Sequence, residues 1–411
     1  MNTSASPRFS QRIAWDAPSN ALSQILDARR KAGQPILDLT LSNPSHAKLG
    51  DWDAALHQAF ATAPSFAYSP EPEGTVSARN AVAEYYASGR CDLAPVAVSP
   101  EKIVLSASSS ESYSFLFQAL CEPGDEVLAP LPSYPLFEFL AGLSAVSLRS
   151  YRLRYHGEWH LDFAALEASV GPRTRAIVVV NPNNPTGGYL RMAEKQRLLS
   201  LCAERGMVLI ADEVFEEYPL QCSSEEQLGR TISSFSGPQQ EAVCVSLGGL
   251  SKSAGLPQMK LGWMIVNGPT EAAERLRQRL ILIADTYLSV STPVQAALPQ
   301  LLGIGRHIGN SIRTRIRTNY CFLQSAVANA PHMTCLATEA GWNTVLRVPA
   351  IQSDSAWAEH LLSVCGILVQ PGYFYDFEGE AWLVISLLPQ EAVFAEAITR
   401  LCSEVEALAA I

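Results

Sequence analysis

The fold is decided by the stretch VVVNPNNPTG, residues 178–187. A run of valines leads directly into two X-Pro steps and a glycine, a pattern that predicts a buried strand ending in a fixed turn. Open α/β sheets bind ligands at the carboxyl ends of their strands, so the turn would present Asn184 at a ligand site. Taken alone, the stretch could equally be an ordinary loop, and its surroundings have to decide.

On both sides of this stretch, short apolar runs alternate with helical patterns such as residues 193–205, which indicates a mostly parallel sheet covered by helices. From about residue 270 the pattern changes to long helices, followed by short strands and a final helix, which predicts a second, α+β domain. The predicted strands of the first part are residues 103–105, 126–128, 145–148, 176–180, 207–210 and 242–247. The long helices are predicted over 271–285 and 294–328, the later strands over 344–348 and 383–387, and the last helix after Pro389.

Composition narrows the class of protein. The 411 residues are 48% hydrophobic and 17% charged, which is typical of a compact globular enzyme. A net charge of -10 argues against binding to nucleic acid, whose phosphate backbone attracts basic surfaces. The nine scattered cysteines suggest neither a disulfide framework nor a zinc site. No apolar run approaches the roughly 20 residues of a membrane span, and residues 1–12 lack the core of a signal peptide, so we expect a cytoplasmic protein.

Two further motifs carry ionisable groups at strand ends. The apolar run 208–211 is followed by Asp212, and a buried carboxylate there is costly unless it has a cationic partner such as a protonated pyridine nitrogen. The alternative for Asp212 is a helix N-cap. Lys252 follows the run 243–247 among small and apolar residues, where desolvation lowers the pKa of an amine and makes it nucleophilic. The alternative for Lys252 is a surface lysine.

NPNNPTG, ADEV and LSKS, in this order and at these separations, resemble the class I and II aminotransferases of pyridoxal-phosphate (PLP) fold type I. The resemblance implies a large α/β domain with a mostly parallel, seven-stranded type of sheet between helices. A smaller α+β domain would be built from both chain ends. We expect an arm and part of the small domain over 1–45, the large domain over 46–300, and the small domain over 301–411.

The resemblance also implies pyridoxal 5'-phosphate as the cofactor and assigns residue roles. Lys252 would be the Schiff-base lysine and the base that moves the substrate proton, and Asp212 would keep the ring nitrogen protonated. Asn184 would hydrogen-bond the phenolic oxygen of the cofactor.

Five more residues would surround the cofactor. Tyr134 would stack on the ring, unless it is simply a core or loop tyrosine. Ser109 and Ser110 would bind the phosphate at a helix start, where a plain serine N-cap at residue 108 or 110 is the competing interpretation. Lys260 stands where the family usually has a phosphate-binding arginine. Tyr68 would reach the phosphate of a neighbouring subunit, which implies a homodimer.

Departures from the family pattern concern the substrate. Val384 aligns with the arginine that usually clamps the substrate α-carboxylate, and Phe215 stands in place of a tyrosine. Arg347, on another predicted strand, is a candidate substitute for the clamp, although it could equally be an exposed strand residue. Asn43, in a loop resembling the family's substrate-facing loop, is a further candidate.

The leading hypothesis is therefore an aminotransferase acting between an L-amino acid and a 2-oxo acid. One alternative is a PLP-dependent lyase or synthase, such as a C-S lyase, which would use the same residues. A second alternative is a non-catalytic PLP-binding module. We expect small-molecule substrates, no nucleic acid or membrane partner, and no metal.

Overall fold

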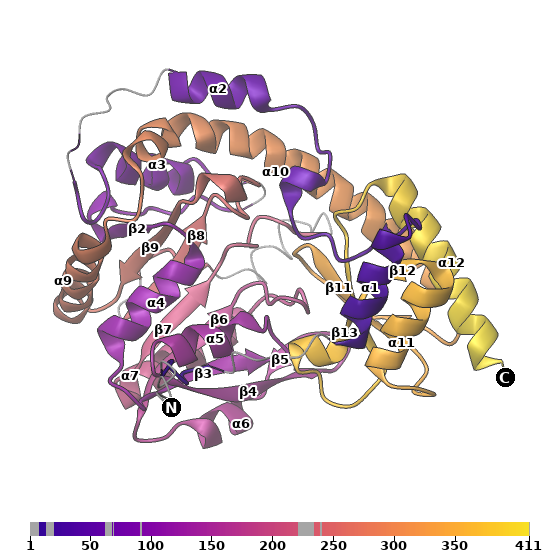
Figure 1. The fold of residues 1–411 in the computed structure, drawn as a ribbon. Coiled ribbons are helices and arrows are strands. Elements are labelled where there is room, and N and C mark those ends of the chain that lie inside the picture. Colours follow the sequence, from indigo (N-terminus) through magenta and orange to yellow (C-terminus); the bar gives the residue numbers. More distant parts are fainter. Residues whose placement is uncertain are drawn as a thin grey trace, which may run out of the picture.

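The computed structural model describes residues 8–13, 20–61, 68, 70–90, 93–220, 234–238 and 241–410. In these residues, an eight-stranded sheet forms the centre of the large domain, and helices cover both of its faces (Figure 1). A four-stranded antiparallel sheet and a two-stranded parallel pair lie beside it, with the last helix packed at that side. The α/β architecture with a smaller second sheet domain, predicted from the sequence, is confirmed.

The large sheet has the strand order β2-β9-β8-β7-β6-β3-β4-β5. Only β9 and β5 oppose the common direction, so the sheet is mostly parallel. The short β5, paired as a hairpin with β4, is the eighth strand beyond the expected seven. The strands are β2 (Ile103–Ser106), β3 (Glu126–Leu131), β4 (Ser147–Tyr155), β5 (Trp159–Leu161), β6 (Thr174–Val180), β7 (Val208–Asp212), β8 (Cys244–Gly249) and β9 (Gly262–Asn267).

Unbroken apolar runs form these strands because both faces of the sheet are buried. Along β6, Val178 and Val180 face one cluster, and Ile177 and Val179 face the other. The helices of the first face are α4 (Ser109–Leu120), α5 (Leu136–Leu143) and α9 (Thr270–Tyr287). The second face carries α3 (Val76–Ala87), α6 (Phe163–Ser169), α7 (Met192–Arg205) and α10 (Thr292–Val327), and α2 (Asp53–Ala61) packs on α10.

Both chain ends contribute to the smaller domain, as predicted. Near the amino end, β1 (Leu37–Asp38) pairs in parallel with β12 (Ile367–Leu368). The 36-residue helix α10 runs without a break through position 300, so the boundary expected there stays a prediction (Figure 1). The other elements of this domain are α1 (Ala21–Lys31), β10 (Thr334–Cys335), β11 (Asn343–Arg347), α11 (Asp354–His360), β13 (Gln370–Pro371), β14 (Trp382–Ser386) and α12 (Glu391–Ala409).

Parallel strands bring their carboxyl ends to one edge of the sheet. The register sets Val180 of β6 opposite Asp212 of β7, and Asp212 opposite Leu247 of β8. Residues that directly follow these strands therefore lie near one another, although they are far apart in the sequence. This edge carries the three motifs that the sequence singled out.

Two properties of the described ranges concern the class of protein. None of their helices has the length and apolarity needed to cross a membrane. The seven cysteines they contain are free, and they hold no group of three or more His, Cys, Asp or Glu side chains suited to a metal ion.

Candidate functional site

Asp212 ends β7 as a buried carboxylate at the carboxyl edge. Its Oδ1 accepts from the backbone N–H of Val214 at 3.2 Å, and its Oδ2 accepts from the hydroxyl of Tyr113 at 3.0 Å. Burial raises the pKa of Asp212 to about 6, while these two donors and the charge of Lys252 act in the opposite direction. A turn follows Asp212 and not a helix, so the N-cap alternative is wrong.

Tyr113 was not singled out from the sequence. It lies within α4, where its position resembles that of any other buried aromatic residue. Only the packing of α4 across the sheet brings its hydroxyl to Asp212, 99 positions away along the chain. The sequence signal that could have identified Tyr113 is a tyrosine on the buried face of the helix that follows the serine-rich loop.

Lys252 lies in the turn after β8, and two aromatic rings lie beside its amine. Its Nζ is 5.0 Å from the ring centroid of Trp342 and 5.6 Å from that of Phe215. Burial lowers the pKa of Lys252, against the opposing effect of the Asp212 carboxylate. The surface-lysine alternative is therefore wrong, and the lowered pKa increases the fraction of neutral, nucleophilic amine.

Lys252 and Asp212 lie close enough to interact electrostatically. Each shifts the pKa of the other, yet among the described residues no ion pair joins them and no hydrogen bond engages Nζ of Lys252. The main chain beneath the lysine is fixed, because the hydroxyl of Tyr218 donates to the Lys252 carbonyl at 2.5 Å. The carboxyl edge of the sheet therefore carries an amine with a lowered pKa close to a buried acid.

Asn184 is held by the smaller domain. Its Oδ1 accepts from Nδ2 of Asn343, the first residue of β11, at 2.8 Å. No described residue accepts from Nδ2 of Asn184, so this group can donate to a ligand. The loop is fixed at Gly187, whose carbonyl accepts from the N–H of Ala340 at 3.0 Å. A Cβ at Gly187 would lie 2.3 Å from Thr338, so this contact requires glycine.

The serine-rich loop between β2 and α4 has the form of an anion site. Ser108 is the N-cap, since its hydroxyl accepts from the N–H of Glu111 at 3.1 Å. Ser109 and Ser110 begin the helix, where backbone N–H groups lack acceptors within the helix. Gly262 lets β9 lie against this loop, because a Cβ there would come 3.2 Å from the backbone of Ser108.

Three residues that were predicted to surround the cofactor are not in contact with Lys252 or Asp212. Lys260 is exposed, in a left-handed backbone conformation with φ 51°. Tyr68 is 80% exposed and borders a cleft of about 260 Å³. Tyr134 is 48% exposed and borders another cleft, of about 440 Å³, together with Tyr373. Neither Lys252 nor Asp212 lines either cleft. The roles of these three residues stay predictions.

The candidate carboxylate-binding residues lie apart as well. Arg347 is at the opposite end of β11 from Asn343, about 13 Å along the strand, and its guanidinium lies over the ring of Trp382. Asn43 caps its own short turn, where its Oδ1 accepts from the N–H of Ser45 at 3.1 Å. The structure brings neither side chain into contact with Asn184.

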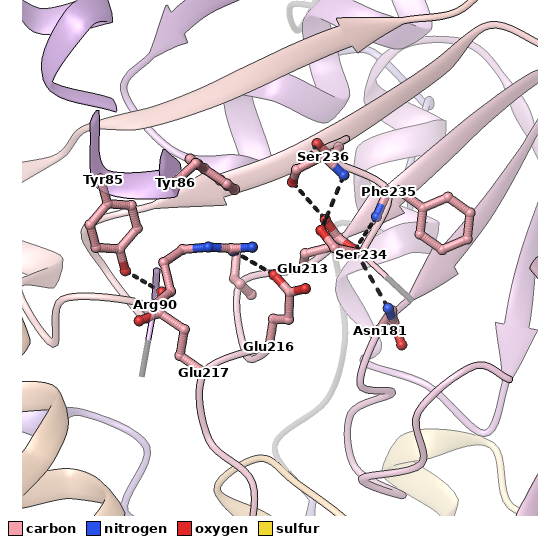
Figure 2. Close-up of polar contacts among 12 residues, drawn as sticks. Tyr85, Tyr86, Arg90, Asn181, Glu213, Glu216, Glu217, Ser234, Phe235 and Ser236 are labelled. Carbon is pink, nitrogen blue, oxygen red and sulfur yellow. Dashed lines mark hydrogen bonds and ion pairs between the residues drawn. The ribbon is translucent and has the colours of Figure 1, made fainter. Parts of the chain in front are cut away.

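The turn that follows β7 is held in place by buried charged side chains (Figure 2). Glu216 forms an ion pair with Arg90 at 2.5 Å, and both side chains are buried. Beside this pair, Glu217 accepts from the hydroxyl of Tyr85. Glu213 accepts from the N–H of Phe235 at 2.7 Å, and burial raises its pKa to about 8. These contacts fasten the turn that connects Asp212 to Tyr218 and, through Tyr218, to the backbone of Lys252.

Replacing Arg90 with alanine should therefore destabilise the protein strongly. The change leaves Glu216 buried without its partner, and loss of one member of a buried pair costs about 3–5 kcal/mol of unfolding free energy. The matched control is Arg154→Ala, which removes an exposed pair with Asp162 and should cost less than about 1 kcal/mol. Denaturant-induced unfolding measures both, and similar losses for the two variants would contradict the structural role of Arg90.

The chain is similar to known proteins over most of its length. Residues 34–401 match the family described as "Aminotransferase class I and II". The "Glutamate-pyruvate aminotransferase AlaA" of Haemophilus influenzae is 26% identical over 377 residues, 90% of each chain. The "S-alkyl-thiohydroximate lyase SUR1" of Arabidopsis thaliana is 29% identical over 235 residues, 56% of this chain and 48% of the relative.

Among solved structures, the alanine aminotransferase from Pyrococcus furiosus superposes with a TM-score of 0.85 at 21% identity. The match covers 97% of this chain and all of the other. At this identity the likeness establishes the fold.

Proposed function

The chain belongs to the class I and II aminotransferase family and is a transaminase, and we propose that it moves an amino group between an L-amino acid and a 2-oxo acid with Lys252 as the reactive amine. One observation carries the proposal. A desolvated lysine follows β8 and a buried aspartate ends the adjacent β7, so the two groups interact at the carboxyl edge, and no ion pair joins them among the described residues. A transaminase needs such a pair to bind opposite ends of one planar cofactor.

The residues fit pyridoxal 5'-phosphate. Within the described ranges, Nζ of Lys252 has no hydrogen-bond or ion-pair partner and nothing accepts from Nδ2 of Asn184, so this amide could donate to the phenolic oxygen. Asp212 would hold a proton on the ring nitrogen. The start of α4, with Ser109 and Ser110, offers N–H groups and hydroxyls to the phosphate. When bound, pyridoxal 5'-phosphate supplies an aldehyde that bonds amines reversibly and a ring that withdraws electrons from the substrate α-carbon.

The chain's own residues then act on protons. The neutral amine of Lys252 would take the proton from the substrate α-carbon and deliver it to C4′, the aldehyde carbon of the cofactor, and its lowered pKa suits it to this role. The charge of Asp212 keeps the proton on the ring nitrogen. Tyr113 and the N–H of Val214 favour the charged form of Asp212 by hydrogen bonding. The rings of Trp342 and Phe215 exclude water from the amine.

A homodimer completes the proposed site. Tyr68 is largely exposed within one chain, as expected of a side chain that reaches the phosphate of a neighbouring subunit. Lys260 would add a point charge near that phosphate. Tyr134 would close on the ring after rearrangement of its loop. We place this enzyme in the cytoplasm. A lower cofactor affinity in Tyr68→Phe, together with a two-subunit mass in solution, would support the shared site.

A half-reaction screen tests the function. Holoenzyme is mixed with single amino acids, beginning with alanine and glutamate because the AlaA relative acts on glutamate and pyruvate by its name. A transaminase should convert the cofactor to its amine form and release one equivalent of 2-oxo acid per site. Continuous 2-oxo acid release without an acceptor would instead identify a lyase, the activity named for the Arabidopsis relative. A chain that binds no cofactor would be a non-catalytic module.

Replacing Tyr113 with phenylalanine should change the pH dependence of cofactor binding. The Tyr113 hydroxyl lowers the pKa of Asp212 by stabilising the carboxylate, so its removal raises that pKa above about 6. Asp212 must be charged to hold the ring nitrogen, so affinity should fall with decreasing pH at a higher midpoint in the variant. Fluorescence titration of the apoenzyme from pH 5 to 8 measures this. The cofactor phosphate also titrates near pH 6, but it does so about equally with both proteins. The readout is therefore the difference between the pH midpoints of the unchanged protein and the variant. Identical midpoints would exclude this role for Tyr113.

A further inference from the structure

We propose that Trp342 and Asn343 are specificity-determining residues, which bind the substrate carboxylate through uncharged N–H donors. The inference rests on the proposed function and specifies how the same site recognises its substrate. Both residues lie at the start of β11, beside Lys252 and Asn184 of the large domain. Neither was singled out from the sequence.

Trp342 presents a donor that no described residue satisfies. The residue is only 2% exposed, and its Nε1 is buried without a hydrogen-bond partner in the part of the chain that the structure describes. A buried N–H without an acceptor is costly, so such a group usually indicates a missing ligand or water. The ring of Trp342 lies over Nζ of Lys252, at 5.0 Å. The indole that carries this N–H therefore lies beside the reacting amine.

Asn343 presents a second donor from the same segment. One N–H of its amide is engaged by Oδ1 of Asn184, which leaves the other N–H and its own Oδ1. The side chain is half-buried, and it follows Trp342 directly in the sequence. Asn343 thus contacts Asn184, and Trp342, the residue before Asn343, contacts Lys252, so the start of β11 offers neutral donors beside two of the motif residues.

The strand face that continues from Asn343 offers no stronger donor near the site. Paired residues of antiparallel strands share a face, so Val345 and Val384 lie on the same side as Asn343. Val384 is fully buried in a cluster with Trp159 and Tyr375, so apolar packing fills the position at which the family arginine was expected. Among the described residues of β11 and β14, the one cation on this face is Arg347, at the far end.

Neutral donors predict weak discrimination between a carboxylate and its uncharged amide, because the bidentate pairing of a guanidinium is absent. The probe pair is propionate and propionamide, which bind without reacting. Calorimetry with the holoenzyme gives both Kd values. We expect the two values to agree within about 10-fold in the unchanged protein.

A charge series at Asn343 is the decisive test. Asn343→Lys should favour propionate over propionamide by a further factor of about 10 or more, and Asn343→Asp should shift the ratio similarly in the opposite direction. Trp342→Phe keeps the ring over Lys252, removes the N–H, and should weaken propionate more than propionamide. Arg347→Ala is the matched control and should leave the ratio unchanged.

Two results would overturn the inference. The first is a strong preference for propionate over propionamide that stays the same in all Asn343 variants. The second is a preference for propionate that disappears in Arg347→Ala. Both can be observed in a working transaminase, so they leave the proposed function intact. A protein that fails the half-reaction screen yet shows the Asn343 charge dependence would lose the proposed function and keep the recognition site.

Discussion

Lys252→Ala should lower the rate of amino transfer by at least about 10 000-fold, since it removes both the amine that bonds the cofactor and the base that moves the α-proton. The side chain forms no hydrogen bond or ion pair within the described ranges, so its loss should not unfold the protein. The visible absorption of the lysine-bound cofactor should disappear as well. Stopped-flow absorbance with the preferred amino acid measures both effects.

The control is Lys102→Ala. Lys102 lies just before β2, at the opposite edge of the sheet, where its Nζ donates to Asn267 at 3.1 Å. This change also deletes a lysine side chain and should leave both rate and spectrum unchanged. Lys252→Arg separates charge from chemistry, because a guanidinium keeps the positive charge and cannot act as the amine. Residual transfer within 10-fold of the unchanged enzyme in Lys252→Ala would refute the assignment of the reactive lysine.

Asp212→Asn should reduce the rate by roughly 100- to 10 000-fold, as expected for loss of a preorganised charge at the reaction centre. The amide has nearly the same shape but cannot keep a proton on the ring nitrogen. Because the charge acts on the reacting carbon through the ring, kcat should fall more than KM rises. Steady-state kinetics at saturating cofactor measures both constants.

The same substitution should remove the pH dependence that Asp212 gives to cofactor binding. The unchanged protein should lose affinity as pH falls through about 6, where Asp212 takes up a proton, whereas Asp212→Asn should follow only the cofactor phosphate. Asp125→Asn is the control, since Asp125 pairs with Arg175 at the opposite edge of the sheet. An unchanged kcat in Asp212→Asn would show that the ring nitrogen needs no charged partner here.

The sequence by itself determined six of the eight strands of the large sheet and the three motif residues. Lys252, Asp212 and Asn184 each follow an apolar strand, and parallel strands must bring such residues to one edge. Their meeting was therefore predictable from local patterns alone. The antiparallel β9 was missed, since its fully buried run has no periodicity that distinguishes strand from helix.

Tertiary packing decided which other side chains contact the three motif residues. Tyr113 reaches Asp212 across 99 positions, and Asn343 reaches Asn184 across 159. No local pattern encodes these contacts, because they depend on how α4 lies on the sheet and on where the start of β11 meets the large domain. Arg347 illustrates the converse case. It stands on the same strand as Asn343, yet the 3.3 Å rise of each residue carries it to the far end of β11, and only the folded chain shows which of the two faces the site.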